Sequence, residues 1–135
     1  MKKTSMILCG MMLLASSAMA QVKVIAHRGH WNSQGAAQNS IAAMQNAKKA
    51  DVWGSEFDVH ITTDGTVVVN HDDDIHGIII ENAKYADIKN LKLANGEPIA
   101  TLKSYLEAGK KLAPMQLILE IKAHQTPERE DRCVK

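Results

Sequence analysis

Four short apolar runs recur along the chain, and polar or titratable residues stand within or directly after each of them. The runs cover residues 22–26, 54–61, 67–70 and 116–121. Short runs rich in valine, isoleucine and leucine predict buried strands rather than helices. The carboxyl ends of parallel strands meet at one edge of an α/β sheet, where active sites lie. The pattern therefore predicts a parallel α/β sheet with a functional edge.

Helix-like segments separate these strands. They are expected over residues 41–49, from Thr101 to about residue 112, and from Pro127 onward, with one further turn near residues 86–91. Asn39 or Ser40 would cap the first of them, and Thr126 the last. Residues 63–66 read Thr-Asp-Gly-Thr, which predicts a tight turn.

The first twenty residues predict a secretory signal peptide. Two lysines precede an apolar stretch, and Ala18-Met19-Ala20 is a small-x-small cleavage site. We therefore expect residues 1–20 to be removed and residues 21–135 to form one domain, exported to the periplasm or the medium. The apolar stretch is short for a membrane span, so no stable membrane anchor is expected after cleavage.

Composition narrows the possible partners. Without residues 1–20 the chain carries 14 basic and 15 acidic residues, which argues against a nucleic-acid partner. Only Cys133 remains, so no internal disulfide is expected. The sequence does not indicate an oligomeric state.

Two carboxylates in the second run form the first candidate site. Glu56 and Asp58 are two residues apart on a predicted strand, so their side chains project to one face. Two such carboxylates repel each other unless a cation or a shared proton lies between them. Ca²⁺ and Mg²⁺ are suited to bind both carboxylates. A pair of solvated surface charges is the plainer alternative.

The other strand ends add groups suited to phosphate chemistry. His27 and Arg28 end the first run and His71 ends the third, so two histidines could share base and acid roles while arginine holds a phosphate. Glu120 and Lys122 end the fourth run. Each residue alone could be a structural histidine or a surface charge. Their joint placement predicts that all seven line one pocket.

Several other residues receive plainer interpretations. His60 shares the face of Glu56 and Asp58 and could support them, whereas the remaining histidines are expected in loops. Trp53 is expected in the core, and Trp31 in the core or on a pocket wall.

The sequence resembles the glycerophosphodiester phosphodiesterase family over nearly all of residues 21–135. The matching motifs are His27-Arg28-Gly29, Asn39-Ser40, Glu56-Phe57-Asp58-Val59, Thr63-Asp64-Gly65, Val67-Val68-Val69, His71-Asp72, Gly96-Glu97-Pro98-Ile99, Thr101-Leu102 and Leu117-Ile118-Leu119-Glu120-Ile121-Lys122.

This resemblance implies a (β/α) TIM-type barrel that hydrolyses small glycerophosphodiesters to an alcohol and glycerol 3-phosphate. It implies His27 and His71 as acid and base, and Glu56, Asp58 and Glu120 as ligands of a divalent metal. Arg28 and Lys122 would contact the substrate phosphate.

Two features depart from the resemblance. Gln38 stands where the family usually has glutamate. Complete barrels need about 250 residues, so the chain corresponds to the first half, and we expect little turnover from it alone. An inactive truncated homologue, acting at most as a phosphodiester-binding or interaction module, is the alternative. A phospholipase C-like enzyme would need a long apolar rim, which these residues lack.

Overall fold

The computed structural model describes residues 22–135, so the predicted signal peptide lies outside the described residues. The elements follow in the order β1 (Ile25–Ala26), α1 (Ile41–Lys49), β2 (Gly54–Ile61), β3 (Val67–Val69), β4 (Asp74–Ile75), β5 (Ile78–Ile79), the 3₁₀ helix η1 (Ile80–Asn82), α2 (Tyr85–Ile88), α3 (Leu102–Lys110), β6 (Gln116–Ile121) and α4 (Pro127–Arg132). Among these helices none is long and apolar enough to cross a bilayer.

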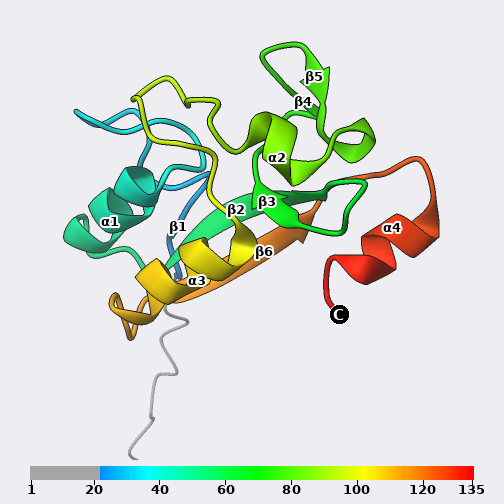
Figure 1. The fold of residues 1–135 in the computed structure, drawn as a ribbon. Helices are drawn as coiled ribbons and strands as arrows, with labels where there is room; N and C mark the ends of the chain where they lie inside the picture. Colours follow the sequence, from blue (N-terminus) through cyan, green and yellow to red (C-terminus); the bar gives the residue numbers. More distant parts are fainter. Residues whose placement is uncertain (1–21) are drawn as a thin grey trace, which may run out of the picture.

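Strand β2 is the centre of the sheet, and all of its residues are buried. It pairs in parallel with β1 and β6 and antiparallel with β3 (Figure 1). The bonds to β6 use odd-numbered residues, since Gln116 N donates to Trp53 O and Lys122 N donates to Val59 O. Even-numbered residues of β2 make the hydrogen bonds on its other edge. This edge pairs with β1 near the start of β2 and with β3 near its end.

The expectation of a wholly parallel sheet is wrong for β3, which pairs with β2 as an antiparallel hairpin. Only residues 62–66 link the two strands, and Thr62 N donates to Thr66 O within this tight turn. A parallel pairing needs a crossover of about a dozen residues or more. Helix α1 supplies such a crossover between β1 and β2, and these two strands are parallel.

The two faces of β2 have different roles. Phe57, Val59 and Ile61 point into the apolar core, where they pack with residues of α1 and α3 such as Met44 and Tyr105. The Phe57 and Tyr105 ring centroids lie 4.7 Å apart. The opposite face carries Glu56, Asp58 and His60, because successive side chains of a strand alternate between its two faces. The helices thus cover the outer face of a partial (β/α) barrel, and the polar side chains face inward.

The predicted helices are present. Ser40 caps α1, its hydroxyl accepting from Ala43 N at 3.0 Å, and Thr101 caps α3 in the same way. Helix α4 begins at Pro127 as predicted, but the Thr126 hydroxyl makes no capping hydrogen bond.

The expected core position of Trp53 is wrong. Its side chain is 40% exposed, and the Lys23 ammonium lies 4.4 Å from the centre of one of its rings. The residue precedes β2, so it lies outside the layer that the helices cover.

Candidate active site

Three carboxylates from two adjacent strands meet on the inner face of the sheet. Asp58 is fully buried and Glu56 nearly so, and Glu120 on β6 lies in register beside Asp58. Oxygen atoms of the three carboxylates all lie within 4.8 Å of one another. Burial raises the pKa of Glu56, and the negative charge of Asp58 raises it further.

Asn39 holds Asp58 from the loop before α1. Its Nδ2 donates to Asp58 Oδ2 at 2.9 Å, and its Oδ1 accepts from Asp58 N at 3.1 Å. Asn39 has a φ of +60° and is almost fully buried. The sequence indicated Asn39 only as a possible helix cap. The bond to Asp58 spans 19 residues, so no local pattern predicts it. The one available signal was that asparagine tolerates a left-handed backbone.

The turn after β1 brings Arg28 over these carboxylates. Arg28 and Gly29 both have positive φ, and Gly29 lies so close to Ala43 that a Cβ would be 2.7 Å from its backbone. Arg28 N donates to Glu56 Oε2 at 2.7 Å.

The Arg28 guanidinium is held on three sides. Nη1 donates to Gln38 Oε1 at 2.6 Å, Nη2 contacts His71 Nε2 at 2.7 Å, and Nε lies 3.9 Å from Asp58 Oδ2. Gln38, the departure from the family pattern, therefore orients this arginine.

The hairpin returns His71 to the end of the sheet where His27 lies. Since a guanidinium has no acceptor, His71 Nε2 must accept from Arg28, and Nδ1 then donates to Asp72 Oδ1 at 2.7 Å. His60 is buried and donates to the His71 carbonyl at 3.2 Å, so it fixes the backbone beneath that residue. His27 Nε2 lies 3.9 Å from Glu56 Oε2, and its side chain is largely exposed.

Lys122 completes the set from the end of β6. Its ammonium lies 2.9 Å from Glu120 Oε1 and 3.6 Å from Asp58 Oδ1. The hydrogen bond between Lys122 and Glu120 lowers the pKa of Glu120 and raises the pKa of Lys122. All seven residues predicted from the sequence are therefore neighbours, while their catalytic roles stay predictions.

The donor set fits a hard divalent cation. Glu56 Oε1 is buried and has no hydrogen-bond partner among the described residues, while buried Asp58 Oδ1 has no hydrogen bond and only the Lys122 ammonium nearby, at 3.6 Å. Unpartnered buried carboxylate oxygens are costly unless a positive ion neutralises them. Ca²⁺ and Mg²⁺ take oxygen ligands of this kind. Glu56, Asp58 and Glu120 could thus hold such an ion.

The hollows at this end of the sheet reach the two histidines separately. One hollow of about 450 Å³ reaches His71, and a second of about 280 Å³ reaches His27. Glu56 and Asp58 line neither, because Arg28 lies across them and bonds to Glu56 through its backbone.

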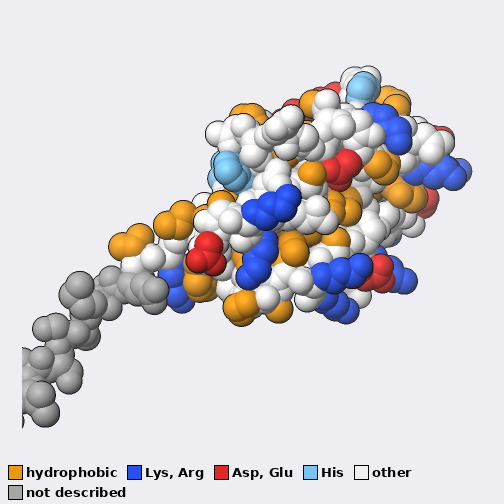
Figure 2. All heavy atoms as spheres, turned by 90° about the vertical axis from the view of Figure 1, so that its left-hand side faces the viewer, with side chains coloured by type: hydrophobic (Ala, Val, Ile, Leu, Met, Phe, Trp, Pro, Cys, Tyr) orange, Lys and Arg blue, Asp and Glu red, His pale blue; other side chains and the backbone are white. Residues whose placement is uncertain are grey.

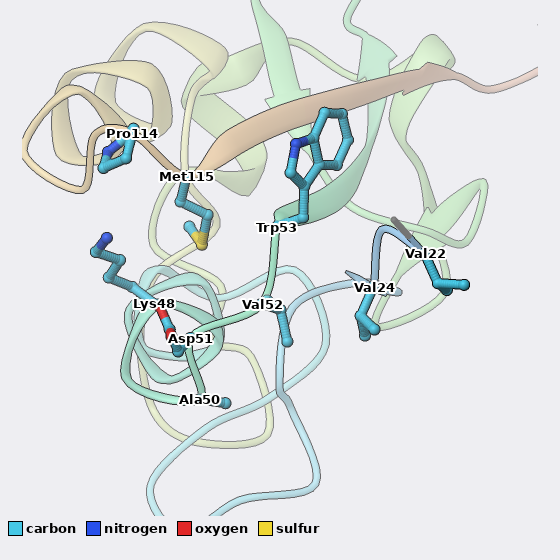
Figure 3. Close-up of a pocket in the computed structure, with 9 residues that line it drawn as sticks. All are labelled: Val22, Val24, Lys48, Ala50, Asp51, Val52, Trp53, Pro114 and Met115. Atoms are coloured by element: carbon cyan, nitrogen blue, oxygen red, sulfur yellow. The ribbon is translucent and has the colours of Figure 1, made fainter. Parts of the chain in front are cut away.

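A further hollow, of about 510 Å³, lies where β1, β2 and β6 begin, far from these residues (Figure 3). It includes Val22 and Val24, which are exposed, and hydrophobic side chains gather beside the first described residues in Figure 2. None of the seven predicted site residues lines it.

The fold and the site together define a class of protein. Carboxylates for a cation, a guanidinium and an ammonium for an anion, and two imidazoles at the C-terminal ends of barrel strands are the groups that metal-assisted phosphate-ester chemistry uses. The sequence model of the glycerophosphoryl diester phosphodiesterase family matches residues 27–135, and the chain belongs to this family.

Solved structures show the same fold. A glycerophosphodiester phosphodiesterase from Parabacteroides distasonis is 50% identical, with a TM-score of 0.80, over 82% of this chain and 47% of that one. A phosphodiesterase from Oleispira antarctica, solved in complex with the product sn-glycerol-3-phosphate, is 30% identical, with a TM-score of 0.69, over 81% of this chain and 48% of that one. The chain spans about half the length of these solved proteins.

Curated relatives match over a shorter region. A glycerophosphodiester phosphodiesterase from Caldanaerobacter subterraneus is 44% identical over 52 residues, which are 38% of this chain and 21% of that protein. Glycerophosphodiester phosphodiesterase 1 from Rattus norvegicus is 40% identical over 55 residues, which are 41% of this chain and 16% of that protein.

Proposed function

We propose that this chain carries the catalytic centre for hydrolysis of small glycerophosphodiesters to an alcohol and glycerol 3-phosphate. The observation that carries the proposal is the convergence of three carboxylates, two cations and two histidines from β1, β2, β6 and the β3 hairpin. Family membership supports it, as does the product named for the Oleispira antarctica relative.

Binding of the phosphate would fall to Arg28 and Lys122. Both cations already lie within 4 Å of Asp58, so they need little rearrangement to meet a phosphate above it. Ca²⁺ or Mg²⁺ on Glu56, Asp58 and Glu120 would offset the negative charge that develops on the phosphate oxygens.

Proton transfer would fall to the two histidines. One imidazole takes the proton from the attacking hydroxyl and the other protonates the oxygen of the leaving alcohol. Attack by water gives glycerol 3-phosphate directly. Attack by the neighbouring glycerol hydroxyl gives a cyclic phosphate, which water then opens to glycerol 3-phosphate while the two histidines exchange roles. Contacts from Asp72 and His60 hold His71 in place.

Turnover of glycerophosphocholine by a complete barrel that contains this chain tests this division. Removing a general acid or base typically costs about 10²–10⁴-fold in rate, so His27→Ala and His71→Ala should each lose that much. His76→Asn is the control, because His76 lies in an exposed turn with a φ of +53° that asparagine tolerates. Rates unchanged in both site variants would contradict the proposal. Binding of glycerol 3-phosphate by wild type without turnover would instead indicate the phosphodiester-binding module.

We also propose that the chain is exported, on the basis of the signal-peptide pattern in residues 1–20. Mass spectrometry of the protein from fractionated cells should find a mature N-terminus at Gln21 outside the cytoplasm. An intact Met1 terminus in the cytoplasm would contradict export.

A further inference from the structure

An exposed apolar surface lies at the end of the sheet opposite the candidate active site. Val22, Val24 and Trp53 are 85%, 57% and 40% exposed, and they border the hollow of about 510 Å³. Gly54 N donates to Val24 O, so Val24 lies next to Trp53 across the pair of β1 and β2. Figure 3 shows Trp53 between Met115 on one side and the two valines on the other. No step proposed above uses these residues.

Five lysines surround this apolar surface. The Lys23 ammonium lies 4.4 Å from the centre of one ring of the tryptophan, and Lys48 lines the hollow. Helices α1 and α3 both end on this side of the sheet, α1 with Lys49 and α3 with Lys110, which Lys111 follows. In Figure 2, Lys and Arg side chains lie close to the hydrophobic ones beside the first described residues. We call the two valines, the tryptophan and the five lysines the basal surface.

The basal surface stays positively charged even after its neighbours are counted. Residues 22–24, 48–53 and 107–115 form this end of the fold, and they hold five lysines but only two acidic residues. The two helix ends add about half a negative charge each, so a net charge of about +2 remains. The other end of the strands instead carries three consecutive aspartates, residues 72–74. Although its total charge is nearly balanced, the chain therefore has one basic end.

Helix dipoles explain only part of this pattern. Lysines in the last turn of a helix offset the negative charge of its exposed carbonyl groups, which accounts for the lysines on α1 and α3. The dipoles do not account for Lys23, which precedes β1, or for the tryptophan and the two valines that are exposed beside it. An exposed apolar patch with a charged rim is typical of a surface that binds a partner.

An anionic lipid bilayer fits the basal surface better than a folded protein does. Indole rings prefer the headgroup region of a bilayer, and lysine side chains reach lipid phosphates while their stems cover apolar surface. Among the described residues none of the five lysines forms an ion pair, so all five can adapt to a fluid layer of charge. The apolar stretch of residues 6–15 stands a few positions before Val22 and would bring this end of the chain to a membrane during export.

We propose that the basal surface docks reversibly on an anionic lipid bilayer. Trp53 would lie in the headgroup region, and the lysines would contact the lipid phosphates. The candidate active site would then face the aqueous phase, where small diesters diffuse. The contact is a weak electrostatic one rather than a stable anchor. It does not depend on the proposed function, because no residue of the basal surface takes part in that chemistry.

Co-sedimentation with vesicles tests the proposal. Residues 21–135 contain every strand, every helix and both apolar cores of the described fold, so the chain is used from Gln21 and the predicted signal peptide cannot itself bind lipid. One set of vesicles holds phosphatidylcholine and phosphatidylglycerol in equal parts, and the other holds phosphatidylcholine alone.

Two double variants separate the basal surface from charge in general. Lys48→Gln with Lys111→Gln removes two lysines from the basal surface. Lys89→Gln with Lys92→Gln removes the same charge from exposed positions after α2 and is the matched control. Lys111 and Lys89 both follow the last residue of a helix, so the cost to helix stability is similar in the two variants.

Wild type should bind the anionic vesicles and not those of phosphatidylcholine alone. Each lysine near an anionic surface strengthens binding about fivefold, so the basal double variant should bind about thirtyfold more weakly at low salt, and the control should bind like wild type. Binding should also weaken between about 0.1 M and about 1 M salt, because the screening length falls from about 10 Å to about 3 Å.

Tryptophan fluorescence gives the orientation of the docked chain. The chain has two tryptophans, so Trp31→Phe leaves Trp53 as the only tryptophan fluorophore, and Trp53→Phe leaves Trp31, which lines the hollow at His71. Brominated lipids in the anionic vesicles should quench Trp53 and leave Trp31 unchanged.

Three results would overturn the proposal. Absence of binding to the anionic vesicles would exclude the bilayer and leave an acidic protein as the partner of this surface. Equal loss of binding in the two double variants would show that only the total charge matters. Quenching of Trp31 without Trp53 would place the catalytic end, not the basal surface, on the membrane. Each of these results leaves the proposed function standing, since turnover and phosphate binding are measured without lipid.

Discussion

Replacing Asp58 by asparagine tests the metal centre through a change of one charge. Asp58 is fully buried, and asparagine keeps its volume and an acceptor for the Asn39 amide. A cation present at a hundred times its dissociation constant raises the free energy of unfolding by about 2.7 kcal/mol. For a domain of this size, that is roughly 10 °C in melting temperature. If the substitution weakens cation binding about a hundredfold, the cation raises the free energy of unfolding by only about 0.4 kcal/mol, or the melting temperature by roughly 2 °C.

Circular dichroism melting, after removal of metal with EDTA and with Ca²⁺ or Mg²⁺ restored, gives the shift for each protein. Each variant is compared with itself, so its metal-free stability cancels. Asp51→Asn is the matched control, because Asp51 lies near the opposite ends of the strands and its φ of +54° tolerates asparagine. A full shift in Asp58→Asn would refute the ligand assignment, as would the absence of any shift in wild type.

Three further predictions address other groups. A nitrophenyl leaving group needs little protonation, so it should restore turnover in only one of His27→Ala and His71→Ala, and equal recovery would contradict separate acid and base roles. Asn39→Gly should lower the free energy of unfolding in urea by about 1–3 kcal/mol, because buried groups of Asp58 lose their partners. Asn39→Ala should lower the free energy of unfolding by about 1 kcal/mol more than Asn39→Gly, because alanine is strained at positive φ. Equal losses in the two variants would exclude that strain. Burial raises the pKa of Tyr105, so the unfolded chain releases this proton first, from about pH 10. Stability should therefore fall above that pH, and Tyr105→Phe should remove part of the fall; an unchanged pH dependence would contradict this.

Local patterns predicted the secondary structure well. Helix α1 and strands β2 and β6 have the bounds expected from apolar runs and caps, because short-range rules govern these features. The direction of β3 could also have been deduced from its short turn, since no parallel crossover fits there. The β4–β5 hairpin was missed, because each strand has only two residues and no alternation to detect.

The site was predictable as a set of residues but not as a geometry. Glu56 and Asp58 were identified by their two-residue spacing on one strand face, and the other five groups by their place at the end of an apolar run. The contacts that orient them come from loops, as with Asn39 on Asp58 and Gln38 on Arg28. Such contacts depend on backbone turns with positive φ, which no spacing rule predicts.

The position of the site follows from the pairing of β2. One edge of this strand pairs with β1 up to Ser55 and with β3 from Val59, so the edge is free of strands between them. Asn39 fills part of this gap by accepting from Asp58 N. His27 directly follows the end of β1 and His71 comes just after the end of β3, so both histidines lie beside the gap although they are far apart in sequence.

Calorimetric titration with sn-glycerol 3-phosphate tests most directly whether these side chains form one centre for a metal ion and a phosphate ester. We predict binding at a single site that requires Ca²⁺ or Mg²⁺ and is lost in Arg28→Gln. A folded chain that does not bind, or that binds equally well in EDTA and in Arg28→Gln, would contradict the proposed centre.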